Sequence, residues 1–531
     1  MSATLHDAAH RVLGTGARLR DIQSDALDGL TEHDTLLVAR SGAGKTAVYA
    51  IATLMTGRLT VVVSPLLALQ RDQVNALREA GLRADSVSSA RTGSQSGAAL
   101  RAAGDGLLDV LLLAPEQLVR AQVQDALVGA DVGLVVVDEA HCVSEWGHDF
   151  RPDYLAVAGV VHRLGDPRLL ALTATASPRV RTEIVERLGM TAPRVLVHDA
   201  DRPNIWLGVR HAATSDARDE LVVRTALDEE GPTLVYARTH RHTEALARAL
   251  TDAGRPTEAY HAGRPAAERT RVQDDFLAGR TDLLVATSAF GMGVDRADIR
   301  LVVHAGLPPS LDSYYQEVGR AGRDDQPARA VGAVLPGDVG LNRFLSSPGG
   351  PRPASVRAVL GAVTQGATTR HEVVAATGLT ARTTSRALAA LLDVGALDSH
   401  ERGYRPGTID EPTALRAIRD RRERQRAVDR SRVAMVQTYA DSSDCRRRLL
   451  LELLGEQHPH RCGACDSCDA GTSVDVLDGR LTGGQPVVHE HWGPGTVSAV
   501  EADRVTVLFE ERGYVTLDTE VALDFGLLTP R

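Results

Sequence analysis

Short apolar runs alternate with amphipathic stretches through most of the first 345 residues. Between residues 18 and 200, the strand-like runs are Thr35–Val38, Leu59–Val63, Val110–Leu113, Leu134–Val137 and Leu169–Leu172. Residues 203–345 repeat the pattern, with runs at Thr233–Tyr236, Asp282–Ala286 and Leu301–His304. Strands that alternate with helices are typical of a parallel sheet covered on both faces. The pattern therefore predicts an α/β protein with two lobes, joined near Asp201–Asn204.

The pattern changes after Pro351 to short helices with a turn. Thr369–Leu397 contains a helix, a Thr-Gly-Leu-Thr turn and a second amphipathic helix, and a hairpin-like segment follows at Leu397–Pro406. This order is the outline of a winged helix. An arginine-rich helical stretch, Arg416–Tyr439, comes next and leads into a group of cysteines.

The tail from Pro486 is β-like. Apolar and polar positions alternate in Arg504–Phe509 and Tyr514–Leu517, and glycine-containing turns separate the runs. Such a pattern favours a small SH3-like or Tudor-like barrel. We therefore expect five parts in the chain, at residues 1–200, 201–350, 351–410, 411–472 and 484–531.

Length and composition agree with a multidomain globular protein. A chain of 531 residues is too long for one hydrophobic core, and 43% hydrophobic with 24% charged residues is ordinary for a globular protein. There is no charged-then-apolar N-terminal leader and no apolar run long enough to cross a bilayer. We therefore expect a cytoplasmic protein with no membrane partner.

The net charge of −9 argues weakly against nucleic acid as a partner, because dedicated binders are usually basic overall. The placement of the positive charge is more informative than its sum. Lys45 is the only lysine among 60 Lys and Arg residues. A compact ammonium fits a phosphate cradle where a wide guanidinium does not, so this lysine suggests chemistry that arginine cannot supply.

Lys45 lies in a glycine-rich loop, Ala39-Arg40-Ser41-Gly42-Ala43-Gly44-Lys45-Thr46, between a predicted strand and a predicted helix. Gly42 and Gly44 let the backbone N–H groups turn towards phosphate oxygens, and the helix N-terminus adds partial positive charge. Lys45 would bridge the terminal phosphates of ATP, and the Thr46 hydroxyl would hold Mg²⁺. The alternative is a glycine-rich turn before an ordinary helix.

Two carboxylates follow the apolar run Leu134–Val137. Asp138 can coordinate Mg²⁺, while Glu139 can orient and deprotonate the attacking water. Alone, an Asp-Glu pair after a strand reads as a solvated turn, but the phosphate loop changes that interpretation. Arg320 and Arg323 lie three residues apart, hence on one face of a helix, and suit arginine fingers that stabilise the transferring phosphoryl group. A surface helix with exposed arginines is the competing interpretation.

Four of the five cysteines gather late in the chain. Cys445, Cys462, Cys465 and Cys468 have the spacing of a closed tetrahedral Zn²⁺ site, which would be structural because no position stays open. His458 and His460 could compete as ligands, but four cysteines make them unnecessary. We assign no metal to Cys142.

Taken in order, these motifs resemble superfamily 2 helicases of the Asp-Glu-Ala-His type, and most closely the RecQ-like DNA helicases. The resemblance runs from about residue 18 to 345 and resumes at about 416–470. It implies two tandem RecA-like lobes, with adenine read by Gln23, Arg20 nearby and Asp295 helping to bind nucleotide. It also implies that Ser64-Pro65-Leu66 with Gln73, and Ala114-Pro115-Glu116, track the DNA backbone, and that Thr173-Ala174-Thr175 couples the lobes.

The segment Ser144–Tyr154 places three aromatics within nine residues of a chain with 3% aromatics. Bases can stack on such rings without sequence preference. The segment resembles the aromatic-rich loop by which RecQ-like enzymes couple DNA binding to hydrolysis, which implies coupling roles for His141, Trp146, His148, Phe150 and Arg151. A hydrophobic plug of the first lobe is the competing interpretation.

The chain departs from the family pattern in two places. RecQ-like enzymes usually carry a winged helix after the zinc module, whereas the candidate here precedes it, and the terminal part is β-rich. The arginines of Arg419–Arg432 and Arg446–Arg448 form the densest positive region. We favour phosphate binding there over a solvated helix.

Together these features predict an ATP-dependent DNA helicase of repair or recombination, moving 3′ to 5′ on single-stranded and forked DNA and associated with the nucleoid. The direction comes only from the resemblance. A translocase that displaces proteins without efficient unwinding remains an alternative, as does a winged-helix regulator with a vestigial ATPase. The motor motifs leave RNA open as a substrate. The terminal barrel suits a protein partner.

Overall fold

The computed structural model describes residues 4–531, apart from 41, 66, 89–90, 119, 145–151, 199, 292–295, 339, 341–349, 401–402, 457, 459, 474–479, 502 and 511. Five predicted site residues therefore lie outside the described residues: Trp146, His148, Phe150, Arg151 and Asp295. Within the described part, no helix is both long enough and apolar enough to cross a membrane.

The described part of the first lobe holds a seven-stranded parallel sheet. Its order is β3 (Ala84–Val87), β4 (Val110–Leu113), β2 (Leu59–Val63), β5 (Val132–Val137), β6 (Arg168–Thr173), β1 (Thr35–Val38) and β7 (Arg194–Val197). The connecting helices are α1 (Leu5–Leu13), α2 (Asp21–Glu32), α3 (Lys45–Thr56), α4 (Leu67–Glu79), α5 (Gly93–Gly104), α6 (Pro115–Leu118), α7 (Ala121–Val128), α8 (Val157–Arg163) and α9 (Pro178–Leu188), with 3₁₀ turns η1 (Ala140–Val143) and η2 (Pro152–Ala156). Strands β1, β2, β4 and β5 are buried along their whole length, which explains why they read as continuous apolar runs.

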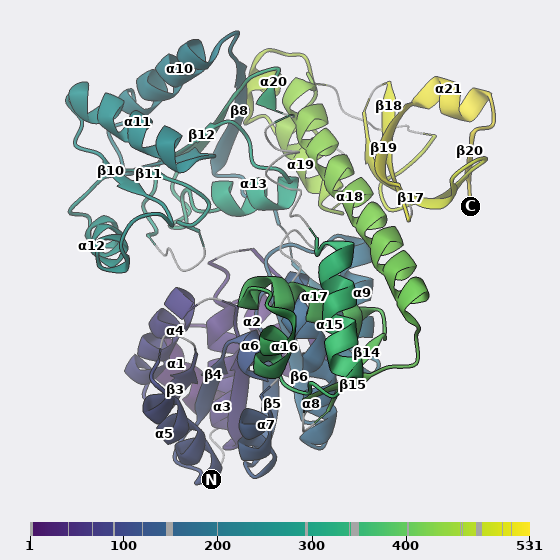
Figure 1. Cartoon of the computed structure of the whole chain (residues 1–531). Helices are drawn as coiled ribbons and strands as arrows, with labels where there is room; N and C mark the ends of the chain where they lie inside the picture. Colours follow the sequence, from purple (N-terminus) through teal and green to yellow (C-terminus); the bar gives the residue numbers. More distant parts are fainter. Residues whose placement is uncertain are drawn as a thin grey trace.

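The second lobe repeats this architecture with a six-stranded parallel sheet (Figure 1). Its order is β10 (Glu258–Tyr260), β11 (Leu283–Ala286), β9 (Thr233–Ala237), β12 (Leu301–Ala305), β13 (Ala328–Val334) and β8 (Ile205–His211). The helices are α10 (Ser215–Leu227), α11 (His240–Asp252), α12 (Ala266–Leu277) and α13 (Leu311–Val318). The two predicted α/β lobes are confirmed.

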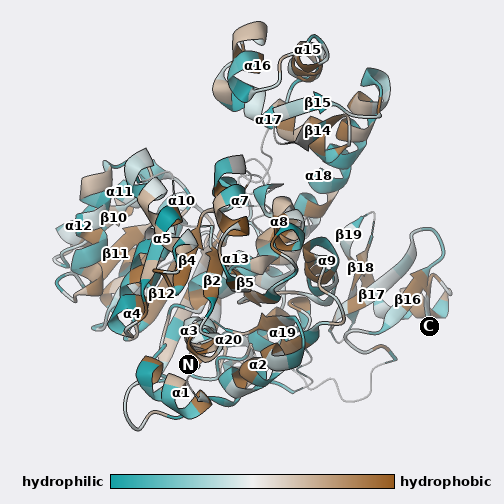
Figure 2. Ribbon diagram, turned by 90° about the horizontal axis from the view of Figure 1, so that it is seen from below, coloured by the Kyte–Doolittle hydropathy of each residue, from teal (hydrophilic) through white to brown (hydrophobic). Residues whose placement is uncertain are grey.

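Three helices and a hairpin follow the second lobe, in the order predicted for a winged helix. They are α15 (Pro353–Thr364), α16 (Arg370–Thr377), α17 (Ala381–Asp393), β14 (Leu397–His400) and β15 (Gly403–Pro406). Val359, Val373, Leu391 and Leu397 belong to a core of their own. Figure 2 shows this module apart from the two lobes, at one end of the long helix α18 (Glu411–Asp441).

The opposite end of α18 packs on the second lobe. Tyr439 of α18 lies 5.3 Å from Tyr314 of α13, measured between ring centroids. Helices α19 (Arg446–Leu453) and α20 (Asp466–Asp469) follow, and their apolar side chains share one core with the second lobe. The helical cysteine-containing module is thus built onto this lobe.

The chain ends in an antiparallel five-stranded sheet. Its order is β19 (Gly513–Asp518), β18 (Arg504–Phe509), β17 (Gly493–Val500), β16 (Pro486–His489) and β20 (Leu528–Pro530), with α21 (Thr519–Asp524) before the last strand. Strand β20 returns to pair with β16, and the edge strands β19 and β20 are not neighbours in the sheet. We call residues 484–531 the terminal β module.

Candidate functional site

The phosphate loop lies between β1 and α3, as predicted. Gly42 and Gly44 both have φ of +80°, a backbone conformation that side chains with a Cβ rarely adopt. Lys45 opens α3 and donates from Nζ to the carbonyls of Ala39, at 2.6 Å, and Arg40, at 3.3 Å. Burial lowers the pKa of Lys45. The ammonium is therefore folded over the loop, where phosphate oxygens would replace its carbonyl partners.

Two residues upstream of the loop hold it in place. The Gln23 amide donates to the Gly44 carbonyl at 3.2 Å, and its oxygen accepts from the Arg20 backbone N–H at 3.0 Å. The Arg20 guanidinium donates to the Gly42 carbonyl at 2.8 Å. Each end of the Gln23 amide is engaged by the chain itself and keeps one further hydrogen-bonding position, which an adenine edge could use.

The predicted pair of carboxylates follows β5 directly. Asp138 is 7% exposed, and its carboxylate accepts from the Gln73 amide at 2.9 Å and from the Glu139 backbone N–H at 3.0 Å. Burial, and then the nearby Glu139, raises the pKa of Asp138 to about 6. Gln73 is buried beside this carboxylate, so the expectation that it tracks the DNA backbone is wrong.

Glu139 occupies a strained position, with φ of +50° in a residue that has a Cβ. Such strain persists where surrounding contacts enforce it, and it is concentrated at functional sites. Its carboxylate lies 3.3 Å from Nδ1 of His141, and the same nitrogen lies 3.1 Å from the Thr173 hydroxyl. Because this hydroxyl donates to the Thr175 carbonyl at 2.9 Å, its oxygen is left to accept from His141. The segment Thr173–Thr175 is thereby linked to Glu139.

The two predicted arginines do not share a helical face. Helix α13 ends at Val318, and Arg320 and Arg323 lie on the turns that follow. Gly322, with φ of +54°, belongs to those turns. Arg320 is 5% exposed and lowers the pKa of the nearby Tyr236 against the effect of burial, whereas Arg323 reaches the first lobe. A Cβ on Gly42 would lie 3.8 Å from Cδ of Arg323.

Arg202, which the sequence analysis did not single out, holds this arginine-bearing turn. Its guanidinium donates to the carbonyls of Gly319 at 3.2 Å, Ala321 at 2.8 Å and Gly322 at 2.7 Å. It is 7% exposed. No motif marks such a residue, because its partners are carbonyls more than 100 residues away.

The four cysteines meet at one point. Their Sγ atoms lie within 4.8 Å of one another, and those of Cys462 and Cys468 are 3.9 Å apart. A tetrahedron of sulfurs around Zn²⁺ at ~2.3 Å has edges of ~3.8 Å, so the geometry fits zinc. Backbone N–H groups donate to Cys445, Cys462 and Cys465 at 3.2–3.4 Å, which stabilises thiolates. His458 instead lies 3.7 Å from Asp201.

The cysteine module covers the β8 edge of the second lobe. The Asp466 carboxylate accepts from the Val209 backbone N–H at 2.8 Å, and Trp206 donates to Asp469 at 2.8 Å. Zinc binding therefore supports the edge of the sheet as well as its own loop.

The arginines Arg446–Arg448 are buried, with exposures of 6%, 4% and 1%. Each is paired inside the protein, with Asp466, Asp201 and Asp444 respectively. The expectation that these three bind phosphate is wrong: they hold the module together. On α18, by contrast, the arginines at 416, 419, 424, 426 and 430 are exposed.

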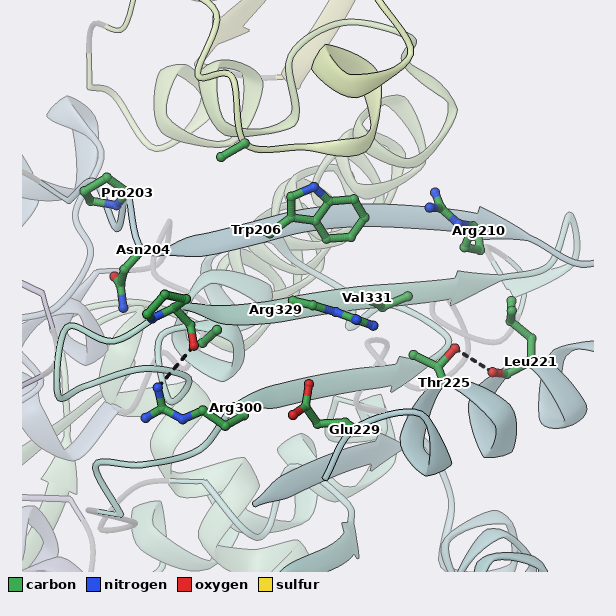
Figure 3. Close-up of a pocket in the computed structure, with 13 residues that line it drawn as sticks. Pro203, Asn204, Trp206, Arg210, Leu221, Thr225, Glu229, Arg300, Arg329 and Val331 are labelled. Atoms are coloured by element: carbon green, nitrogen blue, oxygen red, sulfur yellow. Dashed lines mark hydrogen bonds between the residues drawn. The ribbon is translucent and has the colours of Figure 1, made fainter. Parts of the chain in front are cut away.

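A cavity of about 600 Å³ lies away from the phosphate loop and its carboxylates. It is lined by Trp206 and Arg210 of β8, by Arg329 of β13 and by Ala464 of the cysteine module (Figure 3). It belongs to the junction between the second lobe and the cysteine module.

Comparison with known proteins agrees with the geometry. Family models match residues 20–184 (DEAD/DEAH box helicase), 216–325 (helicase conserved C-terminal domain) and 409–469 (RecQ zinc-binding). Residues 483–524 match a family of unknown function.

The ATP-dependent DNA helicase RecQ of Pasteurella multocida is 36% identical over 341 residues, which cover 64% of this chain and 53% of the relative. A probable ATP-dependent DNA helicase, RecS of Bacillus subtilis, is 35% identical, covering 60% and 64%. The Mycobacterium smegmatis helicase Lhr, solved with single-stranded DNA and AMP-PNP, has a TM-score of 0.52 at 20% identity, covering 81% and 62%. The chain thus spans about half to two thirds of the relatives that it matches.

The phosphate loop and its carboxylates fit Mg-ATP, and the four cysteines form a structural zinc site of the kind that the RecQ zinc-binding model describes. With two helicase lobes followed by this zinc module, the chain is consistent with a RecQ-like helicase of superfamily 2.

Proposed function

We propose that the protein is an ATP-dependent DNA helicase, which couples Mg-ATP hydrolysis to 3′–5′ movement on single-stranded DNA and to duplex unwinding in DNA repair or recombination. One observation carries the proposal: Lys45, Asp138 and Glu139 of the first lobe lie near Arg323 of the second. Burial and the Arg323 guanidinium lower the pKa of Lys45, whereas the Glu139 and Asp138 carboxylates raise it. The site is therefore divided between the two lobes.

Each residue has a distinct role in this proposal. Lys45 and the loop N–H groups bind phosphate oxygens, and Thr46 and Asp138 hold the magnesium ion, which supplies charge neutralisation when bound. Glu139 orients and deprotonates the attacking water. Arg320 and Arg323 stabilise the charge that develops on the transferring phosphoryl group, and Arg202 keeps their turn in place.

The link from Glu139 through His141 to Thr173 supports coupling between hydrolysis and DNA. His141 lies three residues before the aromatic-rich segment, for which we retain a DNA-contacting role for Trp146, His148, Phe150 and Arg151. Asp295 likewise remains a proposed nucleotide contact. We also propose that the five parts of the chain are its domains, with the boundaries predicted from the sequence.

The positions of exposed arginines support forked DNA as the substrate. Helix α17 exposes Arg382 and Arg386 on the second helix of a helix-turn-helix, the element that enters the major groove in such modules. The exposed arginines of α18 continue from this module towards the second lobe. Tyr404 of the β14–β15 hairpin lies within electrostatic range of Asp153, near the end of the aromatic-rich segment. We therefore propose that the duplex is held by the winged helix and its single strand by the lobes.

We further propose a protein partner for the terminal β module and association with the nucleoid. Phe525 and Val521 lie four residues apart at α21, and they are 77% and 47% exposed. Exposed apolar side chains of this kind are typical of protein contacts.

Unwinding assays test the proposal directly. We expect ATP-dependent opening of a fork with a 3′ single-stranded tail and little opening of one with a 5′ tail or of matched RNA. A Glu139→Gln protein is the control, because it keeps the size of the side chain and removes its basicity. ATP turnover without opening of either fork would replace the helicase assignment with that of a translocase.

A further inference from the structure

The terminal β module is joined to the body formed by the second lobe, α18 and α19. Gly513 packs against α18 so closely that a Cβ there would collide with Ser431. The Val500 backbone N–H donates to the Glu452 carboxylate of α19 at 3.1 Å, and Ala499 is buried in the core of this body. The module therefore moves with the second lobe.

The opposite side of the module reaches the first lobe. The Glu510 carboxylate lies 3.1 Å from the Arg179 guanidinium, and Tyr514 lines the same pocket as Ser177. Ser177 is the N-cap of α9. Both contacts of the module thus fall on the first turn of one helix.

The end of α19 touches the same turn from a second direction. Gly455, with φ of +90°, lies against Pro178, where a Cβ would overlap the proline ring. The Glu456 carboxylate lies 3.1 Å from the Arg181 guanidinium. The first turn of α9 is therefore held by two elements that belong to the body of the second lobe.

This turn is close in sequence to the coupling segment. Ser177 follows Thr175 by two residues, and Thr173 contacts His141, whose ring lies 3.3 Å from Glu139. A shift of the first turn of α9 can therefore be transmitted through a short connection to the carboxylate that is proposed to activate water.

We propose that the terminal β module positions the first turn of α9 through Tyr514 and Glu510, and thereby sets how strongly DNA stimulates ATP hydrolysis. This assigns an intramolecular role to a module that matches a family of unknown function, and it rests on the proposed helicase function. Tyr514 and Glu510 are positioning residues, because they act through α9 and touch neither nucleotide nor DNA in the proposed site.

Three variants of the full chain test the proposal. Tyr514→Phe removes the hydroxyl alone, Glu510→Arg places two cations together, and the double variant Arg179→Glu, Glu510→Arg restores an ion pair with its charges exchanged. Arg179 and Glu510 are partly exposed, so their effect should be moderate. We expect the ratio of ATPase rates with and without saturating single-stranded DNA to fall about three-fold in the two single variants. The double variant should return to the wild-type ratio, and rates without DNA should stay unchanged.

Glu520→Arg is the matched control, because it reverses an exposed charge on α21 of the same module. Its ratio should equal that of wild type. If wild type is stimulated by DNA and the ratio is the same in all variants, the positioning role is refuted.

Hydrogen exchange of residues 173–181, measured without nucleotide or DNA, separates this proposal from the proposed function. We expect faster exchange in Tyr514→Phe and Glu510→Arg than in wild type or Glu520→Arg. Faster exchange in a chain that lacks ATPase activity would support the contact and overturn the helicase function. Unchanged exchange together with an unchanged ratio would overturn the positioning role alone.

Discussion

Arg40 of the phosphate loop and Asp325 of the second lobe form an ion pair of 3.6 Å across the interface between the lobes. The arginine side chain is 32% exposed and the aspartate 71%, so water screens the pair and its contribution is small. Its position matters more than its strength, because Arg40 precedes the glycines of the loop while Asp325 follows Arg323 by two residues.

Reversal of one charge in this pair should weaken ATP binding. In Asp325→Arg, two like charges would face each other as the lobes close, and we expect the KM for ATP to rise about three-fold with kcat little changed. Steady-state ATPase measurements give both constants. The double variant Arg40→Asp, Asp325→Arg should recover most of the loss; failure to do so would mean that Arg40 contacts the nucleotide itself.

Lys45→Arg should be as inactive as Lys45→Ala. The ammonium lies 2.6 Å from the Ala39 carbonyl, and a guanidinium is too wide for that space. We expect kcat to fall by a factor on the order of 100 or more in both variants. Fluorescence anisotropy with a labelled single strand should show unchanged DNA affinity without nucleotide. An arginine variant that keeps a tenth of the activity would show that charge alone suffices.

Arg202→Ala should damage the second lobe's contribution to the site. It leaves the Gly319, Ala321 and Gly322 carbonyls without their donor, so we expect a loss of about 2–4 kcal/mol in the free energy of unfolding. The kcat for ATP hydrolysis should fall about ten-fold or more, because Arg320 and Arg323 lose their position. Arg202→Lys should recover little, since one ammonium cannot span three carbonyls. Normal kcat in the alanine variant would contradict the supporting role.

Removal of zinc should destabilise the second lobe. Metal analysis should find about one zinc per chain in wild type and less than half of that in Cys465→Ser. Hydrogen exchange of β8 should become faster in the cysteine variant, because Val209 and Leu207 donate to residues of the zinc loop. If zinc is lost and hydrogen exchange of β8 is unchanged, the metal does not stabilise this part of the lobe.

The Glu452 carboxyl should make stability depend on pH. Burial raises its pKa to about 7 from the ordinary value of 4.5. The Val500 N–H and Arg448 oppose this rise, and the like charges of Asp444 and Glu501 add to it. Because the pKa is higher in the folded state, the folded protein binds the extra proton, and stability falls as pH rises from about 4.5 to 7. We expect Glu452→Gln to be more stable than wild type at pH 8, by on the order of 3 kcal/mol at most, and similar at pH 5. Thermal unfolding of both proteins at both pH values measures this difference. A midpoint for Glu452→Gln below that of wild type at pH 8 would contradict the prediction.

The sequence was most informative where chemistry requires particular residues in a fixed local order. The strands Thr35–Val38, Leu59–Val63 and Val110–Leu113 have the predicted bounds, because buried parallel strands are apolar throughout. The edge strand β7 was not predicted; it is half-exposed and carries Arg194, so it lacks that signal.

Side-chain roles that depend on distant contacts could not be read from the chain. Arg446–Arg448 look like a phosphate-binding cluster, yet each pairs with an aspartate that only the fold brings near. Gln73 lies on α4 but reaches Asp138, which is 65 residues away. The break of α13 before Arg320 was missed because helical spacing alone does not show where a helix ends. The roles of the remaining catalytic residues stay predictions.

Helix α18 has 31 residues, and at 1.5 Å per residue it is about 46 Å long. One end is anchored by Tyr439 beside Tyr314, and the other carries the winged helix through Arg357–Glu411 and Arg421–Asp393. If α18 stays straight, a rotation of about 10° at the second lobe displaces the far end of the helix by about 8 Å. That displacement exceeds the 3.4 Å rise of one base pair, so under the proposed function a small turn within each ATP cycle would carry the winged helix across more than one step.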